Sequence, residues 1–368
     1  VLLALLVGGL GQHRPWFSDA VFWLMAAVGG IHAFQFLIYY LAAFVTGIRV
    51  LDADILFNGF SNPRFFGQFQ VMLLPLVALL LMRCWRRQLI GAAVPLLLVM
   101  VVQWCISFIL GGRGLWLGLL VAHVFLILVN RSFWRLLVLQ LMVAALGCLV
   151  YLLLFRLIPY CLELEPVLRD ELRSTLSGRE LIWRWAWDMA LANPWLGAGP
   201  MHFSATYNPI AAHPHQVILQ WLAEWGGVAT GLAVVLGAWG CTYGAIFLRR
   251  GDAVERDAAL WLAIIGAVVL AQVDGVFVTP YTETWLAILI GLAIAQWTKL
   301  APTKGYQRIA CALFAIPVVL VLGQVLIIEA PALPQSEEAY LIKNHYGWSP
   351  RFWQQGWIPM DVNRDMTD

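Results

Sequence analysis

Long apolar runs separated by short polar breaks fill most of the chain. A membrane-spanning helix needs about 20 predominantly apolar residues, and these runs lack the strict alternation of spanning β-strands. The pattern predicts an all-α polytopic membrane protein. We predict spans near residues 17–46, 69–82, 89–110, 115–129, 136–155, 226–248, 258–273, 285–298 and 308–328. Residues 1–11 look like the remainder of another span, so we expect the N-terminus to be truncated.

Composition agrees with this class. Of the 368 residues, 61% are hydrophobic and 12% are charged, whereas a soluble domain is about a quarter charged. The net charge of +2 does not indicate a nucleic-acid partner, because the basic residues fall at the ends of apolar runs. The six cysteines include no CxxC pair, which argues against a disulfide framework and a zinc site.

One large polar segment, residues 156–216, interrupts the apolar pattern. We therefore divide the chain into N-terminal transmembrane helices (1–155), this loop (156–216), C-terminal transmembrane helices (217–329) and a polar tail (330–368). A membrane protein with one large polar loop is expected to do its chemistry there, although the loop could also be a tether between two bundles.

The basic residues predict the orientation. Lys and Arg are dense in alternate short loops: Arg14, Arg83, Arg86, Arg87, Arg131, Arg135, Arg249, Arg250, Arg256, Lys299, Lys304 and Arg308. Short cytoplasmic loops carry such an excess. The 156–216 loop and the 330–368 tail lie on the other side, so we expect both to be periplasmic.

The loop contains two helical patterns. The stretch SGRELIWRWAWDMALANPWLG predicts a helix with Ser177 as its N-cap and Pro194 after its end. Its tryptophans suit a helix lying at the membrane surface. A second helix is expected to begin after Pro214.

In this second helix, the spacing predicts an apolar side and a polar pair one turn apart. The apolar side would hold Val217, Leu222 and Trp225, and the pair would be Gln220 and Glu224.

Three arginines are candidates for binding an anion. Arg113 lies in GGRG at a membrane boundary, where a charge is costly unless it is paired or hydrated. Arg179 opens the first loop helix, and a helix N-terminus already attracts anions. Arg64, in NPRFFG, is a weaker candidate. Alternatively, Arg113 is an interface anchor and Arg179 forms a salt bridge with Asp170 or Glu171.

Histidines and carboxylates supply candidate acid–base groups. His213 and His215 stand in AHPHQ, and we predict no metal site because no third ligand lies at a clear spacing. An imidazole acting as acid or base fits His215 better. Glu224, Asp274 and His213 are possible supporting residues. Alternatively, Asp274 only ends a helix, and His213 is only a polar loop residue.

Three motifs together carry a family resemblance. GGRGLWLGLL resembles the SRGxxLG-type motif of the O-antigen ligase and polymerase superfamily. SGRELIWRWAWDMALANPWLGAG is similar to its SGRxxxW and PxxGxG motifs, and HPHQVILQWLAEWGGVATG to HNxxLQxxxExGxxG. Here Gln216 replaces the usual Asn, and Gly111 and Gly112 replace the Ser before Arg113. VDGVFVTPYTETWLAIL resembles segments of the related bacterial protein O-oligosaccharyltransferases.

The resemblance implies a fold and an activity. The family is similar to GT-C glycosyltransferases and moves a glycan from undecaprenyl diphosphate to an acceptor at the periplasmic side of the bacterial inner membrane. Its ligases need no metal ion or other cofactor. By motif, Arg113 and Arg179 would hold the lipid diphosphate, and His215 would serve the acceptor hydroxyl. Direct displacement would invert the anomeric centre.

Several functions stay open within and beyond this class. The acceptor would be lipid A–core in an O-antigen ligase, a protein in an O-oligosaccharyltransferase, or another glycan in a polymerase, and we rank them in that order. A lipid or glycan transporter is the rival from another class. It would show inverted repeats and broken helices near the membrane midplane, and the sequence has no convincing internal repeat.

Overall fold

The chain folds as a bundle of helices. The computed structural model describes residues 2–14, 16–45, 51–56, 65–164, 166–168, 178–205, 210–298, 305–329, 331 and 334–335. The principal helices in these ranges are α1 (Leu2–His13), α2 (Trp16–Val45), α3 (Ala53–Leu56), α4 (Phe66–Arg86), α5 (Ile90–Ile109), α6 (Arg113–Val129), α7 (Trp134–Leu152), α8 (Ile158–Cys161), α9 (Arg179–Ala192), α10 (His202–Ala205), α11 (Val217–Leu248), α12 (Glu255–Leu270), α13 (Pro280–Trp297) and α14 (Gly305–Gln324). Within the described ranges the only β pairing is an isolated bridge between Asp52 and Val167.

The helices confirm an all-α polytopic membrane protein. Five helical stretches are long and apolar enough to cross a membrane: Trp16–Val45, Phe66–Arg86, Ile90–Ile109, Arg131–Cys161 and Val217–Leu248. Every predicted span falls on a helix. The runs at 69–82 and 115–129, which are short for spans, extend to Phe66–Arg86 and Arg113–Val129.

Helix α4 lies at the centre of the bundle, against α2, α5, α6 and α12. Nearly all of its side chains are buried, including two glutamines. The Gln70 amide donates to the backbone and side-chain oxygens of Gln103, at 2.7 and 2.9 Å, and the Gln103 amide donates to the Gly29 carbonyl at 2.7 Å. Buried polar groups of a membrane bundle must find such partners internally. This network therefore joins α2, α4 and α5.

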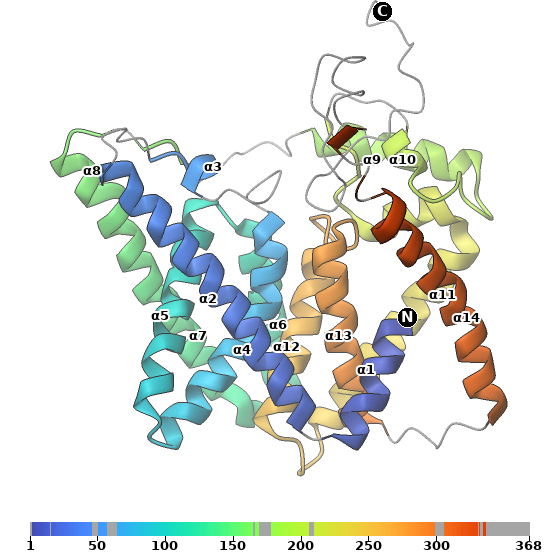
Figure 1. The fold of residues 1–368 in the computed structure, drawn as a ribbon, viewed down its shortest axis with the longest axis horizontal. Helices are drawn as coiled ribbons and strands as arrows, with labels where there is room; N and C mark the ends of the chain where they lie inside the picture. Colours follow the sequence, from blue (N-terminus) through green and yellow to red (C-terminus); the bar gives the residue numbers. More distant parts are fainter. Residues whose placement is uncertain are drawn as a thin grey trace, which may run out of the picture.

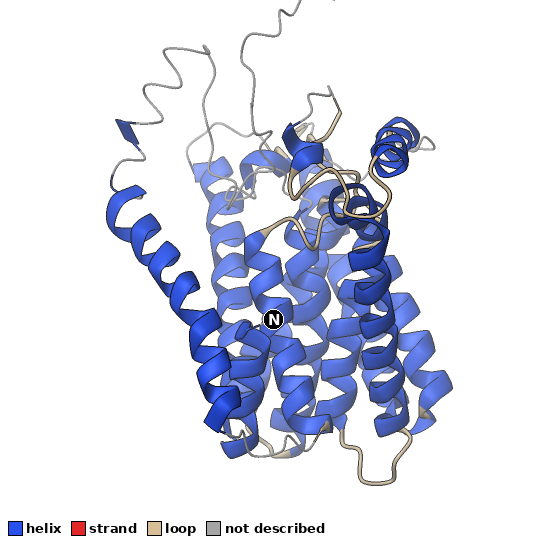
Figure 2. Ribbon diagram, turned by 90° about the vertical axis from the view of Figure 1, so that its right-hand side faces the viewer, coloured by secondary structure: helices blue, strands red, loops and turns tan. Residues whose placement is uncertain are grey.

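The two ends of the bundle differ. The short helices α3, α8, α9 and α10 gather at one end, the upper end in Figure 1. At the opposite end Arg83 pairs with Asp19 at 2.7 Å, and Arg86 pairs with Glu255 through two hydrogen bonds. The 90° view in Figure 2 keeps the same division. The upper end therefore carries the polar loop, and basic residues at the lower end tie α2, α4 and α12 together.

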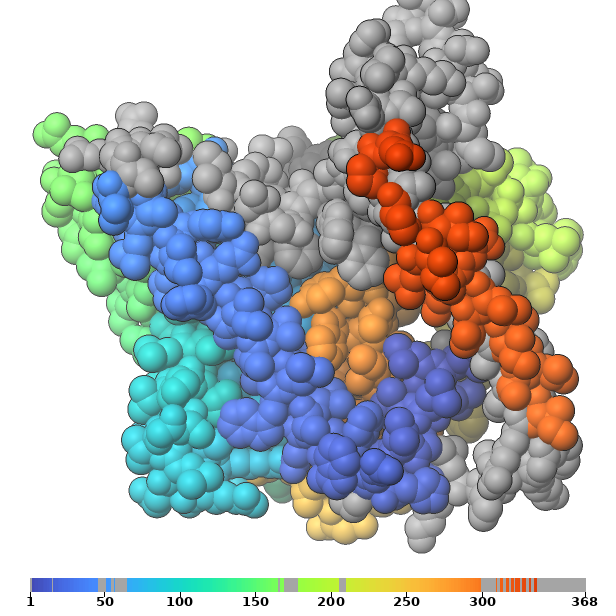
Figure 3. All heavy atoms as spheres, viewed as in Figure 1, coloured from blue at the N-terminus to red at the C-terminus, as the bar shows by residue number. Residues whose placement is uncertain are grey.

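Much of the outer surface is apolar. On α11 the side chains of Leu232, Leu236 and Trp239 are largely exposed. Figure 3 shows another face, where α2 crosses diagonally in front of the bundle. Exposed apolar side chains along spanning helices are expected to contact lipid, because burial inside the protein is not needed to remove them from water.

Helix α11 contains a kink where a loop presses against it. Gly226 has φ 75° and ψ 176°. The PWLGAG loop is hydrogen-bonded to the residues of α11 just before Gly226. Ala198 and Gly199 donate to the carbonyls of Ala223 and Glu224, at 2.9 and 3.0 Å. Two predicted elements, a loop helix after Pro214 and a span from 226, are thus one kinked helix.

Gly226→Ala is expected to lower the free energy of unfolding by roughly 1–3 kcal/mol. A Cβ at Gly226 would lie 2.3 Å from the Trp195 carbonyl oxygen, and the φ and ψ of this residue are nearly exclusive to glycine. The thermal midpoint of the purified protein measures the effect. Gly231→Ala is the matched control, because a Cβ there meets nothing within 4 Å. Equal midpoints for the two variants would contradict the prediction.

Some predictions fall on parts of the chain that the structure does not describe. Arg64, Asp170 and Glu171 lie outside the described residues, as does nearly all of the 330–368 tail. The domain limits at 155, 216 and 329 remain predictions.

Candidate active site

His215 projects from the turn that precedes α11. Trp183 of α9 donates its indole N–H to the Pro214 carbonyl at 2.8 Å. On the other side Gln216 caps α11 by accepting from the Leu219 N–H. Between these anchors His215 has φ 53°, a left-handed conformation that non-glycine residues seldom adopt. Strained residues of this kind persist only when their surroundings hold them, and they cluster at functional sites.

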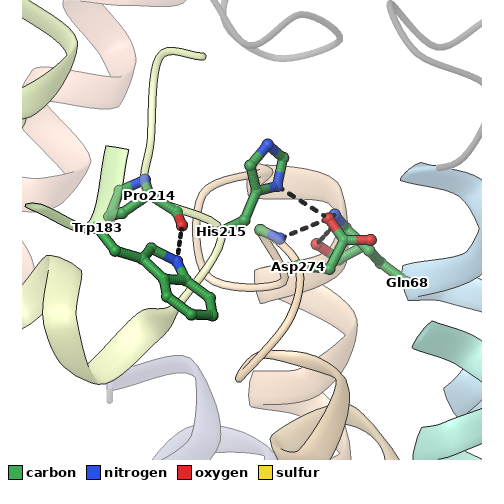
Figure 4. A network of polar contacts seen from close by, with 7 residues as sticks. Gln68, Trp183, Pro214, His215 and Asp274 are labelled. Carbon is green, nitrogen blue, oxygen red and sulfur yellow. Dashed lines mark hydrogen bonds and ion pairs between the residues drawn. The ribbon is translucent and has the colours of Figure 1, made fainter. Parts of the chain in front are cut away.

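The His215 ring faces a carboxylate from the turn after α12. Its Nδ1 lies 3.6 Å from Oδ1 of Asp274 (Figure 4), and both side chains are about one-fifth exposed. The Nδ1 atom is buried and has no hydrogen-bond partner among the described residues. A shift of about 0.5 Å would bring the pair within hydrogen-bonding range, and such contacts are often long before substrate binds.

Asp274 is itself held in place by the bundle. Its Oδ1 accepts from the Gly275 N–H at 2.7 Å and from the Gln68 amide at 3.1 Å (Figure 4). Gln68 is fully buried near the start of α4, and its carbonyl oxygen accepts from the Thr282 hydroxyl at 3.3 Å. Gln68 was not among the predicted site residues. The available signal was a pair of amides, Gln68 and Gln70, near the start of an apolar span.

His213 is fully buried beside this pair. Its ring centroid lies 4.1 Å from that of His215. A Cβ on Gly275 would lie 2.3 Å from the His213 Nε2, so glycine is required for this contact. The two segments are also joined by a bond from the Val217 N–H to the Ala271 carbonyl, at 3.0 Å. His213 is therefore buried against both His215 and the turn that carries Asp274.

The prediction of no metal site rested on a premise that the structure contradicts. A third group does stand beside the two histidines: ligand atoms of His213, His215 and Asp274 all lie within 4.8 Å of one another. Asp274 lies 59 positions after His215 in the sequence numbering, so local spacing could not reveal it. That the chemistry needs no metal stays a prediction.

Arg113 is the first residue of α6 and is exposed. The start of α6 packs against the end of α12, since a Cβ on Gly114 would meet the Leu270 side chain at 2.7 Å and the Val273 side chain at 3.5 Å. Residues 270–273 lead directly into Asp274. The N-terminus of α6 therefore lies beside the turn that carries Asp274. The close packing of the two helices explains why a glycine follows Arg113.

Arg179 is the first residue of α9 and is half-buried. The N-cap residue is Gly178, with φ 78°, and Ser177, the predicted N-cap, lies outside the described residues. Gly178 lies against Ile210, and Trp183, one turn into α9, holds Pro214. The start of α9 is thus attached to the segment that carries the two histidines.

Glu224 lies in a buried setting on α11. Glu224 and Gln220 are buried, whereas Trp225 is exposed and stacks on Trp221. The Glu224 carboxylate accepts from the Phe203 N–H at 3.2 Å, which ties α10 to α11. The polar pair of this helix therefore faces the protein, together with Val217 of its apolar side. The contact with Phe203 gives Glu224 a part in holding the loop.

Fold and site together define a multi-pass α-helical membrane protein with a histidine–carboxylate site at one end of its bundle. Residues 98–236 match the family model described as O-antigen ligase. This region is similar to the O-antigen ligase family, in agreement with the resemblance found in the sequence, and that family implies a glycosyl-transfer enzyme that acts on a lipid-linked glycan and an acceptor. No curated protein and no solved structure matched the chain.

The matched region includes Arg113, Arg179, His213 and His215. Asp274 and Gln68, which complete the polar network around His215, lie outside it.

Proposed function

We propose that this protein is a metal-independent, inverting glycosyltransferase that moves a glycan from undecaprenyl diphosphate to an acceptor hydroxyl. O-antigen ligase, with lipid A–core as the acceptor, is the first choice among the alternatives. The observation that carries the proposal is the His215–Asp274 pair, at 3.6 Å, within a chain whose residues 98–236 match the ligase family.

His215 would act as the base. Its Nδ1 faces Asp274, so Nε2 is the nitrogen that would take the proton of the acceptor hydroxyl. A carboxylate on the other ring nitrogen orients an imidazole and stabilises the imidazolium that forms. The proton would move from the acceptor oxygen to Nε2 as that oxygen bonds to the anomeric carbon. The diphosphate would leave with the electrons of the broken bond.

Arg113 and Arg179 would stabilise the departing diphosphate. Each starts a helix of at least 14 residues, and a helix N-terminus adds a partial positive charge to that of the guanidinium. The start of α6 packs beside Asp274, and the start of α9 packs beside the His215 turn. Two cations approaching from these sides could neutralise the leaving group without a metal. Arg64 would be a third ligand.

Transfer by the purified protein tests this proposal. The protein is reconstituted with an undecaprenyl-diphosphate-linked glycan and offered lipid A–core, a Ser/Thr-rich protein or a second glycan. Product on lipid A–core, formed in the presence of a metal chelator and with inverted anomeric configuration, is the expected result. Exclusive transfer to protein or to glycan would replace the ligase by one of the alternatives. Movement of intact donor across a membrane without transfer would favour the transporter.

The orientation is tested by labelling a cysteine introduced at an exposed position. In a variant lacking the native cysteines, Asp188→Cys on α9 is expected to react with an impermeant thiol reagent in intact spheroplasts, and Ser336→Cys would report on the tail. Asp252→Cys, exposed in the turn before α12, is the opposite-side control and is expected to react only after lysis. Labelling of Asp252→Cys with protection of Asp188→Cys would reverse the proposed periplasmic orientation.

A further inference from the structure

The cluster of His213, His215 and Asp274 offers more than an acid–base pair. Two imidazoles and one carboxylate are ligands that suit zinc, and three protein ligands leave a fourth position for water or another group. The ligand atoms lie within 4.8 Å of one another, whereas ligands of a tetrahedral zinc ion are roughly 3.3 Å apart for bonds of about 2.0 Å. Small rotations of the two imidazole rings would therefore bring the three ligand atoms to the distances that zinc requires.

Several contacts already prepare these groups for an ion. The Nδ1 atom of His215 is buried, faces Asp274 and has no hydrogen-bond partner among the described residues. Asp274 is oriented by the Gln68 amide and the Gly275 N–H (Figure 4). Hydrogen bonds that orient a ligating carboxylate are typical of metal sites, and their loss commonly costs 10- to 100-fold in affinity. His213 is packed against Gly275, with Nε2 on the side of the Asp274 turn.

We propose that His213, His215 and Asp274 bind a zinc-type divalent ion, and that this ion inhibits transfer. The inhibition, unlike the binding, rests on the proposed function. An ion on Nδ1 of a neutral His215 leaves the ring proton on Nε2. The nitrogen that faces the acceptor then has no lone pair to take a proton. The ion also withdraws the Asp274 carboxylate from the imidazole. Zinc would thus act as an inhibitor at the catalytic histidine and not as a cofactor.

Binding is measured first, on purified protein without an affinity tag. Titration with Co²⁺, followed by its visible absorption, and competition with Zn²⁺ are expected to give one site per chain. His213→Leu and Asp274→Asn should each weaken binding at least tenfold. His202→Leu is the matched control: His202 is exposed, lies in the same loop and is not one of the three clustered groups. Thermal midpoints identify any variant that fails to fold, and Gln68→Leu, which should weaken binding by 10- to 100-fold, serves as a second test.

Inhibition is measured next, as the ratio of transfer rates with and without Zn²⁺ within each variant. Wild-type transfer should fall with Zn²⁺ and return with chelator, and His213→Leu should need at least ten times more Zn²⁺, whatever its basal rate. Absence of Co²⁺ and Zn²⁺ binding, or equal losses in His202→Leu and His213→Leu, would overturn the site. Binding at these residues without inhibition would overturn the inhibition and count against His215 as the base. Preparations that bind zinc but never transfer glycan would overturn the proposed function and leave the metal site standing.

Discussion

Replacing His215 with alanine is expected to lower the rate of glycan transfer by roughly a hundred- to ten-thousand-fold, the usual contribution of a positioned general base. An acceptor hydroxyl is a poor nucleophile at neutral pH and must give up its proton as the new bond forms. Binding of the lipid-linked donor should be nearly unchanged, because Arg113 and Arg179 remain. The measurement is the single-turnover transfer rate beside the dissociation constant for the donor.

Two further variants test this assignment: one separates chemistry from folding at His215, and the other replaces the neighbouring His213. His215 has φ 53°, which asparagine tolerates better than alanine, so His215→Asn should keep the turn intact and still lose the rate. His213→Ala should be milder. A normal rate in His215→Ala, or a loss of donor binding there combined with a loss of chemistry in His213→Ala, would show that the base has been assigned to the wrong residue.

Replacing either Arg113 or Arg179 with alanine is expected to lower the rate of glycan transfer by roughly a hundred- to a thousand-fold. This is the usual cost of removing one group that stabilises charge in a transition state. Donor affinity should fall too, because the diphosphate is charged before the reaction starts. Arg→Lys should restore the activity only in part, since lysine lacks the planar fork that binds two phosphate oxygens.

The control for both arginines lies on α9 itself. Arg184 is exposed five residues after Arg179, and Arg184→Ala should transfer at close to the wild-type rate. Thermal midpoints and donor dissociation constants accompany the rates. Near-normal turnover by a folded Arg179→Ala protein would remove this residue from the diphosphate site, and the same result for Arg113→Ala would favour its role as an interface anchor.

The helical architecture could be predicted from the sequence because lipid imposes a simple rule. Spans need long apolar runs, and short basic loops mark the ends of such runs. This rule does not predict the kink at Gly226. That kink depends on the PWLGAG loop pressing on α11, and Trp195 of that loop lies 31 positions before Gly226 in the sequence. The setting of Glu224 also depends on a distant segment, because its carboxylate accepts from the Phe203 N–H of α10.

The candidate site was predictable residue by residue but not as an assembly. The signals for His215 and Asp274 were local: a histidine before a helix and an acid at a membrane boundary. Their approach to 3.6 Å depends on the pairing of residues 216–217 with residues 271–272. Gln68 reaches Asp274 because the bundle packs α4 beside the turn after α12. The hydrophobic periodicity of the sequence does not predict that packing.

The kink at Gly226 also determines how deep in the membrane the candidate site would lie. From Gly227 to Leu248 the helix rises about 33 Å at 1.5 Å per residue, close to the roughly 30 Å hydrocarbon thickness of a bilayer. The turns of α11 before Gly226, together with the His215 turn, would then sit in the headgroup layer. A polyprenyl tail could stay dissolved in the bilayer while its diphosphate reaches this layer, and a hydrophilic acceptor could meet it from the water. Changes of bilayer thickness should therefore alter the turnover by raising or lowering the site relative to the donor's headgroup.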